Sequence, residues 1–289
     1  MSPDLERSLG FAPRADVLLA RGDGTQRLWI EFEISRADPV ANHAKFATAH
    51  LFEPRPEGDA FVSMVSRHVA RGRSNLAASA VYLMRAIGMS AFQTSLLPNL
   101  EPEVVHQLNQ RPVEALVADP RIAVASEIDR ALWVARTVGN VDAHRIHHAA
   151  NLFEVMLNAK TWNEAVATRE GARTWGRRTV TYFVHDPRAE TFAPSKYCAF
   201  VPIDRTTGGH MPSVAMDMEL YASLDESETR FDGNIARQHL LRRLSMVETP
   251  VSQLDDALRR SFTRWFDCVS EAITLHPRGP VVLRPPDWW

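Results

Sequence analysis

The chain of 289 residues has few of the features that mark a secreted, membrane-spanning or zinc-stabilised protein. Its two cysteines, Cys198 and Cys268, are too few for a disulfide framework and lack the spacing of a zinc site, so two buried reduced thiols are expected. It contains no run of about eighteen apolar residues, and its first residues lack the apolar segment of a signal peptide. We therefore expect a cytoplasmic protein without a membrane partner.

The chain also lacks an excess of positive charge and is poor in lysine. Its formal net charge is −2, which argues against a protein that coats nucleic acid nonspecifically, because such binding uses a surplus of Lys and Arg. A local basic groove remains compatible with this balance. Of the 33 basic residues only Lys45, Lys160 and Lys196 are lysines, so a retained lysine is a mild indication of chemistry.

The first hundred residues alternate between predicted helices and strands. A short helix over residues 3–9 precedes two strands that are joined by a glycine-containing turn and form a hairpin. The next helix has Asp38 as its N-cap, Pro39 at its first position and helical apolar spacing to Leu51. A strand, a helix and a strand follow, which predicts an α/β sandwich with a mixed sheet. The predicted strands are RADVLLAR, RLWIEFEIS, AFVSMVS and MSAFQTSLL.

Beyond this core, residues 1–105, the sequence divides into two further regions. Residues 106–159 predict a connecting layer of helices, which includes a long amphipathic stretch from Ser126 to Asn158. Residues 160–289 predict a C-terminal α+β domain. Its strand candidates are RRTVTYFVHD and KYCAFVPI, separated by the loop PRAETFAPS, and its helix candidates are NIARQHLLRRL and VSQLDDALRRSFTRWFDCVSEAI.

Three acidic side chains lie on the predicted hairpin. Asp16 belongs to the first strand, and Glu31 and Glu33 lie two residues apart on the second, so all three can project from one side of the sheet. Magnesium prefers oxygen ligands, usually one or two carboxylates together with waters and phosphate oxygens. This pattern predicts a metal site of Asp16, Glu31 and Glu33 for Mg²⁺, with Mn²⁺ as a substitute. The alternative is an edge strand whose polar face meets water.

The acidic residues and the order of elements resemble the PD-(D/E)XK nuclease superfamily, which includes restriction endonucleases and Holliday junction resolvases. The core of that family runs helix, three strands, helix, strand, with an Asp on the second strand and (D/E)xK on the third. In this sequence Ala15-Asp16 takes the place of Pro-Asp, and Glu31-Phe32-Glu33 takes the place of (D/E)xK. The resemblance covers roughly the first hundred residues and implies a restriction-endonuclease-like mixed sheet flanked by helices.

Two departures from the family pattern affect the expected site. Glu33 stands at the lysine position, as a glutamate does in a minority of restriction enzymes, where it serves as a base or an extra metal ligand. The family's first strand is missing or hidden near Phe11. Lys45, in the helix after the hairpin, can supply the absent ammonium group, and Asn42, one turn earlier, can contact phosphate.

The C-terminal domain offers a mixture of basic and aromatic side chains. Such a mixture suits nucleic acid, because cations meet phosphates while flat rings stack on bases. Core packing explains the aromatic residues Tyr182, Phe183 and Tyr197 equally well. Lys196 follows a turn-forming proline and is expected at an exposed loop tip. The candidate substrate-binding residues of this domain are Arg173, Trp175, Arg177, Arg178 and Lys196.

Other catalytic motifs are weak or absent. His144, His147 and His148 lie near Asp142 at helical spacing, but no HExxH motif is completed, and a histidine cluster on a helix surface is favoured over a metal site. The sequence has neither a GxSxG nucleophile elbow nor a Walker or Rossmann glycine pattern.

The resemblance implies a magnesium-dependent endonuclease that cleaves DNA, in a restriction-type or anti-phage defence role. Asp16 and Glu31 would hold the ion, Glu33 would bind the metal or accept a proton, and Lys45 would steady the scissile phosphate. The C-terminal domain would read the bases of double-stranded DNA, and a homodimer would supply the two active sites that a duplex cut needs. The alternative on the same fold is a catalytically inactive protein that binds DNA or senses a modified base.

Overall fold

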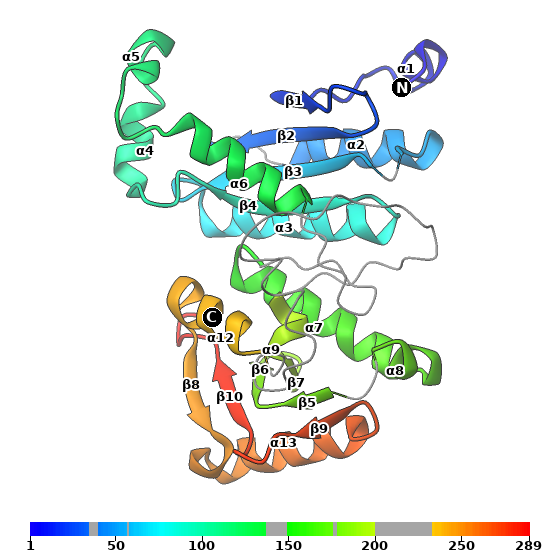
Figure 1. Ribbon diagram of the computed structural model, residues 1–289, viewed down its shortest axis with the longest axis vertical. Helices are drawn as coiled ribbons and strands as arrows, with labels where there is room; N and C mark the ends of the chain where they lie inside the picture. The colour runs from blue at the N-terminus through cyan, green and yellow to red at the C-terminus, as the bar shows by residue number, and fades with distance from the viewer. Residues whose placement is uncertain (35–39, 57, 137–148, 176–177, 200–232) are drawn as a thin grey trace. The chain divides into compact units, whose positions relative to one another are not determined.

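A computed structural model of the chain shows two compact units (Figure 1). The first unit spans Met1–Arg136, and the second contains the described residues from 149 onward. The helices predicted between residues 106 and 159 are therefore shared between the units. No helix among the described residues is long and apolar enough to cross a membrane. The structure describes residues 1–34, 40–56, 58–136, 149–175, 178–199 and 233–289.

The first unit confirms the α/β class and the predicted order of its elements. Helix α1 begins after Ser2, whose hydroxyl accepts a hydrogen bond from the Leu5 N–H, and ends at Gly10, which has a φ of 72°. No strand lies between this helix and β1, so the first strand of the PD-(D/E)XK pattern is not found among the described residues 1–34. The elements are α1 (Pro3–Leu9), β1 (Val17–Ala20), β2 (Arg27–Glu33), α2 (Val40–Phe52), β3 (Ala60–Ser66), α3 (Arg71–Ala86) and β4 (Ala91–Leu96).

The four strands form one sheet in the order β1-β2-β3-β4. Strands β1 and β2 are antiparallel, whereas β2, β3 and β4 run parallel and are connected by α2 and α3. Parallel neighbours need such crossover connections, which explains why each of these strands is followed by a helix. The predicted helix start at Asp38 and Pro39 lies outside the described residues.

Helices cover both faces of this sheet. On one face Phe46 of α2 packs against Trp29, with ring centroids 5.6 Å apart, and against Phe61, at 5.0 Å. Helix α6 (Val124–Arg136) contacts β2, β3 and β4 and crosses in front of the strands in Figure 1, while α2 lies behind them. The short helices α4 (Pro102–Leu108) and α5 (Val113–Val117) precede it.

The register of the parallel strands arranges side chains in rows on the face that α2 covers. The pairing of Phe61 with Trp29 and with Ala91 makes one row apolar. Two residues further along the strands, Glu31 is paired with Ser63 and Ser63 with Gln93, which makes the next row polar. Because neighbouring residues in register point to the same face, these three side chains lie side by side under the helices.

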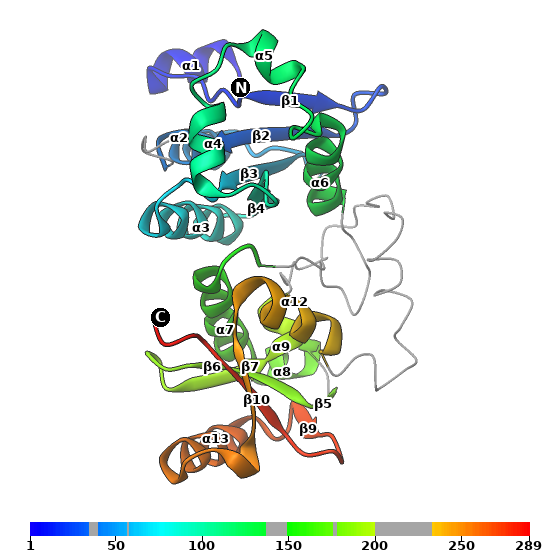
Figure 2. The same ribbon diagram turned by 90° about the vertical axis from the view of Figure 1, so that its left-hand side faces the viewer.

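The second unit contains a four-stranded sheet in the order β7-β6-β10-β8. Strands β6 and β10 are parallel, and the other two pairs are antiparallel, as an α+β arrangement allows. Figures 1 and 2 show α13 on one side of this sheet and α9 and α12 on the other, while α7 contacts β6 and β7 and reaches α13 through Asn163. The described elements are α7 (Leu152–Val166), α8 (Arg169–Trp175), β5 (Arg178–Val180), β6 (Tyr182–Asp186), β7 (Thr191–Pro194), α9 (Ser195–Ala199), α12 (Asn234–Leu244), β8 (Val247–Pro250), the 3₁₀ turn η1 (Val251–Gln253), α13 (Asp256–Val269), β9 (Ile273–Leu275) and β10 (Val281–Arg284).

Several predictions for this unit are wrong. The segment predicted as the strand KYCAFVPI forms the helix α9 over its described part, and the strand β7 lies in the preceding segment, where a loop was expected. A short apolar run fits a buried helix as well as a buried strand, and here Tyr197, Cys198 and Ala199 are all buried. Strands β8, β9 and β10 were not predicted. The thiol of Cys198 is buried as expected, but that of Cys268 is exposed on α13.

Aromatic side chains form the core of the second unit. Trp265 of α13 lies 5.8 Å from Phe183 and 5.5 Å from Phe192, measured between ring centroids. The indole Nε1 of Trp265 donates a 2.9 Å hydrogen bond to the side chain of Asn163 on α7. Core packing is therefore the correct interpretation of Phe183 and also of Tyr197, which is 4% exposed.

Candidate functional site

The candidate site lies where the hairpin meets α2. Asp16 immediately precedes β1, and continuation of the β1–β2 register from Val17 and Ile30 places it opposite Glu31. The Asp16 carboxylate is exposed, and its Oδ2 accepts a 2.8 Å hydrogen bond from the N–H of Phe32. Its negative charge lies close enough to Glu31 to raise the pKa of that residue. The structure therefore brings these two predicted ligands together.

Glu31 is a buried carboxylate with a perturbed pKa. Only 7% of its surface is exposed, and burial is the largest cause of a pKa raised above the ordinary value of 4.5. Its Oε1 accepts a 2.6 Å hydrogen bond from Nδ2 of Asn42, which lowers the pKa in part, as does the positive charge of Lys45. Its Oε2 is buried and meets no hydrogen-bond partner among the residues described.

Asn42 and Lys45 reach this site from the same side of α2. The two residues are three positions apart, which places them on adjacent turns of one helix face. Asn42 orients the Glu31 carboxylate directly, and Lys45 contributes an electrostatic interaction with it. Four of the residues predicted from the sequence, Asp16, Glu31, Asn42 and Lys45, therefore gather in one place.

Glu33 is placed differently from the other two carboxylates. Its Oε1 lies 3.9 Å from Nδ1 of His43, a fully buried histidine on α2 that packs edge-on against Phe61. No group of three or more His, Cys, Asp or Glu side chains with the arrangement of a metal site occurs in the described part of the chain. The predicted cluster of three carboxylates is therefore not assembled, and Asp16 with Glu31 remains as a pair.

This pair has the chemistry that a hard divalent cation requires. Mg²⁺ is commonly held by one or two carboxylates and keeps several of its waters, so a third carboxylate is not needed. The buried Oε2 of Glu31 fits such an ion, because it is an acceptor that no donor of the described chain satisfies. Asp16 and Glu31 are the residues that would hold it.

The substrate-binding residues predicted in the second unit do not form one described surface. Arg173 is exposed on α8. Lys196, expected at an exposed loop tip, is 3% exposed and lies in α9, where its Nζ is 5.4 Å from the centre of the Tyr197 ring. Arg177, and the side chains of Trp175 and Arg178, lie outside the described structure, as do Asp142 and the histidines at 144, 147 and 148.

The chain matches no protein-family model, no curated protein and no solved structure. Its function is therefore inferred from its own residues.

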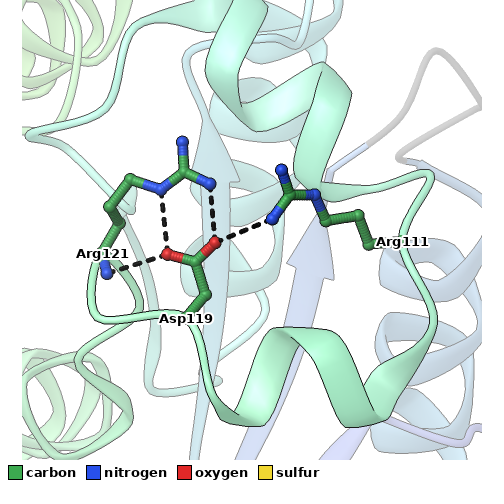
Figure 3. Close-up of polar contacts among 3 residues, drawn as sticks. All are labelled: Arg111, Asp119 and Arg121. Carbon is green, nitrogen blue, oxygen red and sulfur yellow. Dashed lines mark hydrogen bonds and ion pairs between the residues drawn. The ribbon is translucent and has the colours of Figure 1, made fainter.

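A charged cluster that the sequence did not indicate joins the two segments that flank α5. Asp119 accepts hydrogen bonds from Nε and Nη2 of Arg121, at 2.9 and 2.6 Å, and from Nη1 of Arg111, at 3.1 Å (Figure 3). The Arg121 N–H donates a further bond of 3.0 Å to the same carboxylate. These hydrogen bonds, with the two positive charges, hold the pKa of Asp119 far below its ordinary value. The cluster fixes the connection that leads into α6.

We expect Asp119→Asn to lower the unfolding temperature at neutral pH, because the substitution leaves two guanidinium groups without their counter-charge. The folded-state pKa of Asp119 is lowered, so its contribution to stability is complete above the ordinary pKa of 3.8 and is lost as the pH falls below that value toward the folded-state pKa. Thermal unfolding from neutral to acidic pH should show the two proteins converging. Asp129→Asn, at an exposed residue of α6, is the matched control. Equal unfolding temperatures of the wild type and Asp119→Asn would contradict this role. A difference in unfolding temperature that stays the same at every pH would contradict it as well.

Proposed function

We propose that the first unit is a metal-dependent phosphodiester hydrolase of the PD-(D/E)XK type that cleaves double-stranded DNA, with Asp16 and Glu31 as ligands of Mg²⁺ or Mn²⁺. The observation that carries the proposal is the buried Glu31 carboxylate, whose Oε2 has no donor in the described chain and whose pKa is raised. An uncompensated buried charge is costly, and a cation offsets that cost.

Each residue of the site has a role in this proposal. A bound ion lowers the pKa of a water and neutralises charge on the phosphate. Asn42 holds the Glu31 carboxylate in one orientation through its 2.6 Å hydrogen bond. Lys45 places a positive charge next to the same carboxylate, where it can steady the scissile phosphate. Glu33, two residues further along the same face of β2 and beside His43, is the residue that we propose would accept the proton of the attacking water.

Substrate selection is assigned to the second unit. Arg173, exposed on α8, is proposed to contact DNA together with Trp175, Arg177 and Arg178. Lys196 is too deeply buried to meet a DNA surface and is omitted from this group. A homodimer would provide the second active site for a duplex cut. A restriction-type or anti-phage role in the cytoplasm is the biological setting that we propose.

Incubation of the purified full chain with supercoiled plasmid tests the proposal. We expect nicked and then linear DNA in Mg²⁺ or Mn²⁺ and no cleavage in EDTA, because the ion supplies both nucleophile activation and charge neutralisation. The absence of cleavage on plasmid, single-stranded DNA and RNA would contradict the proposal. That result would favour an inactive DNA-binding or modified-base-sensing protein, for which binding to modified and unmodified duplexes is the relevant measurement.

Replacement of Lys45 should affect both rate and pH dependence. We expect Lys45→Met to slow cleavage by about tenfold to a hundredfold, the usual cost of losing a group that supports a metal ligand. Because the Lys45 charge lowers the pKa of Glu31, its loss should also move the acidic limb of the pH–rate profile to higher pH. Lys45→Arg, which keeps the charge, is the matched control and should leave the limb in place. An unmoved limb in Lys45→Met would show that Lys45 does not act on Glu31.

A further inference from the structure

A row of three polar side chains crosses the parallel part of the first sheet. Glu31, Ser63 and Gln93 are direct neighbours in the register of β2, β3 and β4. Their exposed fractions are 7%, 0% and 1%, so each is more than nine-tenths buried. Strands are spaced about 4.8 Å apart, which places the short Ser63 between two longer side chains that can both extend over it.

All three residues carry an oxygen atom without a hydrogen-bond partner. Within the described chain, these atoms are Oε2 of Glu31, Oγ of Ser63 and Oε1 of Gln93. More than about nine in ten buried polar groups are satisfied in folded proteins, so three unsatisfied oxygens on adjacent strands call for a common explanation. Carboxylate and amide oxygens only accept hydrogen bonds, so they cannot satisfy each other. The Ser63 hydroxyl between them carries a single proton, which can serve only one of the two, so at least one of these acceptors lacks a donor among the described residues.

The row also interrupts the hydrophobic core on this face. One apolar cluster, which includes Phe46, Phe61 and Met84, lies toward the start of the strands. A second cluster of Val65, Val69 and Ala77 lies toward their ends. Apolar side chains at these three positions would give a more stable fold, because buried polar groups without partners are destabilising. The polar row is therefore better explained by a ligand than by packing.

We propose that Ser63 and Gln93 complete the cation site of Glu31 by accepting hydrogen bonds from the hydration shell of a divalent ion. This inference rests on the proposed cation site at Glu31 but not on the reaction. Mg²⁺ and Mn²⁺ retain coordinated waters in protein sites, and those waters are strong donors that need oxygen acceptors around them. Ser63 and Gln93 are thus positioning residues, which orient the water around the ion rather than bind it directly.

Titration of the full chain with Mn²⁺, followed by electron paramagnetic resonance, tests this inference without any measurement of cleavage. We expect Gln93→Leu and Ser63→Ala to weaken Mn²⁺ binding by about tenfold to a hundredfold. Gln93→Glu should instead tighten binding, because it adds a carboxylate beside the ion. Thr94→Glu is the matched control, since it places the same charge on the opposite face of β4 and should leave the affinity unchanged.

The outcomes separate this inference from the proposed function. Equal Mn²⁺ affinity in the wild type, Gln93→Leu and Gln93→Glu would overturn the inference and leave the row as a site for ordinary buried water. A wild-type chain that binds no Mn²⁺ would overturn the inference together with the proposed cation site. Weaker binding in Gln93→Leu by a chain that cleaves no DNA would support the inference and contradict the nuclease proposal. Thermal unfolding with and without Mn²⁺ identifies variants that fail to fold.

Discussion

Glu31→Gln is expected to slow metal-dependent DNA cleavage strongly while leaving the fold intact. The substitution keeps the shape of the side chain and an oxygen that can accept from Asn42, but it removes the negative charge that would hold the ion. Metal ions contribute several kcal/mol of transition-state stabilisation, and each factor of ten in rate corresponds to about 1.4 kcal/mol. Initial rates of plasmid nicking should therefore fall by about a hundredfold to a thousandfold.

A matched control distinguishes this effect from a general loss of charge. Glu103 is an exposed carboxylate on α4 of the same unit, and Glu103→Gln should cleave at the wild-type rate. Glu31→Ala should be at least as inactive as Glu31→Gln, because it also removes the acceptor of the Asn42 hydrogen bond. Wild-type cleavage by Glu31→Gln would remove Glu31 from the catalytic site.

The same substitution should stabilise the metal-free protein at neutral pH. Burial raises the pKa of Glu31 in the folded state above its ordinary value of 4.5, so the ionised form is disfavoured by folding. A carboxyl group of this kind weakens the fold progressively as the pH rises from the ordinary pKa through the raised one. Glu31→Gln avoids that cost, and its unfolding temperature should exceed that of the wild type at neutral pH in EDTA.

The pH and metal dependence of this difference provide its test. Below pH values near 4.5 the wild-type carboxyl is protonated in both states, so the two unfolding temperatures should converge. Saturating Mn²⁺ should reverse the order at neutral pH, because a ligand that binds only the folded state stabilises it by mass action. A destabilised Glu31→Gln protein in EDTA would indicate a structural role for this carboxylate. A stabilised Glu31→Gln protein would fit a functional role, because residues that serve function commonly lower the stability of the fold.

The order of elements in the first unit could be predicted from sequence because each element carries a local signal. The alternation in RLWIEFEIS places Glu31 on the same face as Trp29, and the structure packs Trp29 against Phe46 of α2. Alternation alone does not predict which residues of β3 and β4 lie beside Glu31. Ser63 and Gln93 were therefore missed, although both are buried polar residues within predicted strands. Their alignment with Glu31 depends on the register between strands, which is set by tertiary packing.

The placement of Glu33 beside His43 depends on packing in the same way. The sequence shows two glutamates on one face of a strand, but the helix that covers this face decides what each meets. Asn42 meets Glu31 and His43 meets Glu33, because consecutive residues of α2 diverge around the helix.

The second unit was harder to predict because several of its elements are short and pair over long distances. Strand β10 pairs with β6, almost a hundred residues earlier, and with β8. Such pairings leave only a brief apolar pattern in the sequence. The local sequence of helix α9 predicts a strand. The helix is buried within the unit, so Lys196 does not lie at the surface, where the turn-forming Pro194 predicted it.

Binding of Mn²⁺ to the wild-type chain and to Glu31→Gln, measured by electron paramagnetic resonance in the absence of DNA, tests the central claim most directly. If Glu31 and Asp16 hold a catalytic cation, the wild type should bind Mn²⁺ at this site and Glu31→Gln should lose that binding. Equal binding by both proteins, or none by the wild type, would contradict the claim.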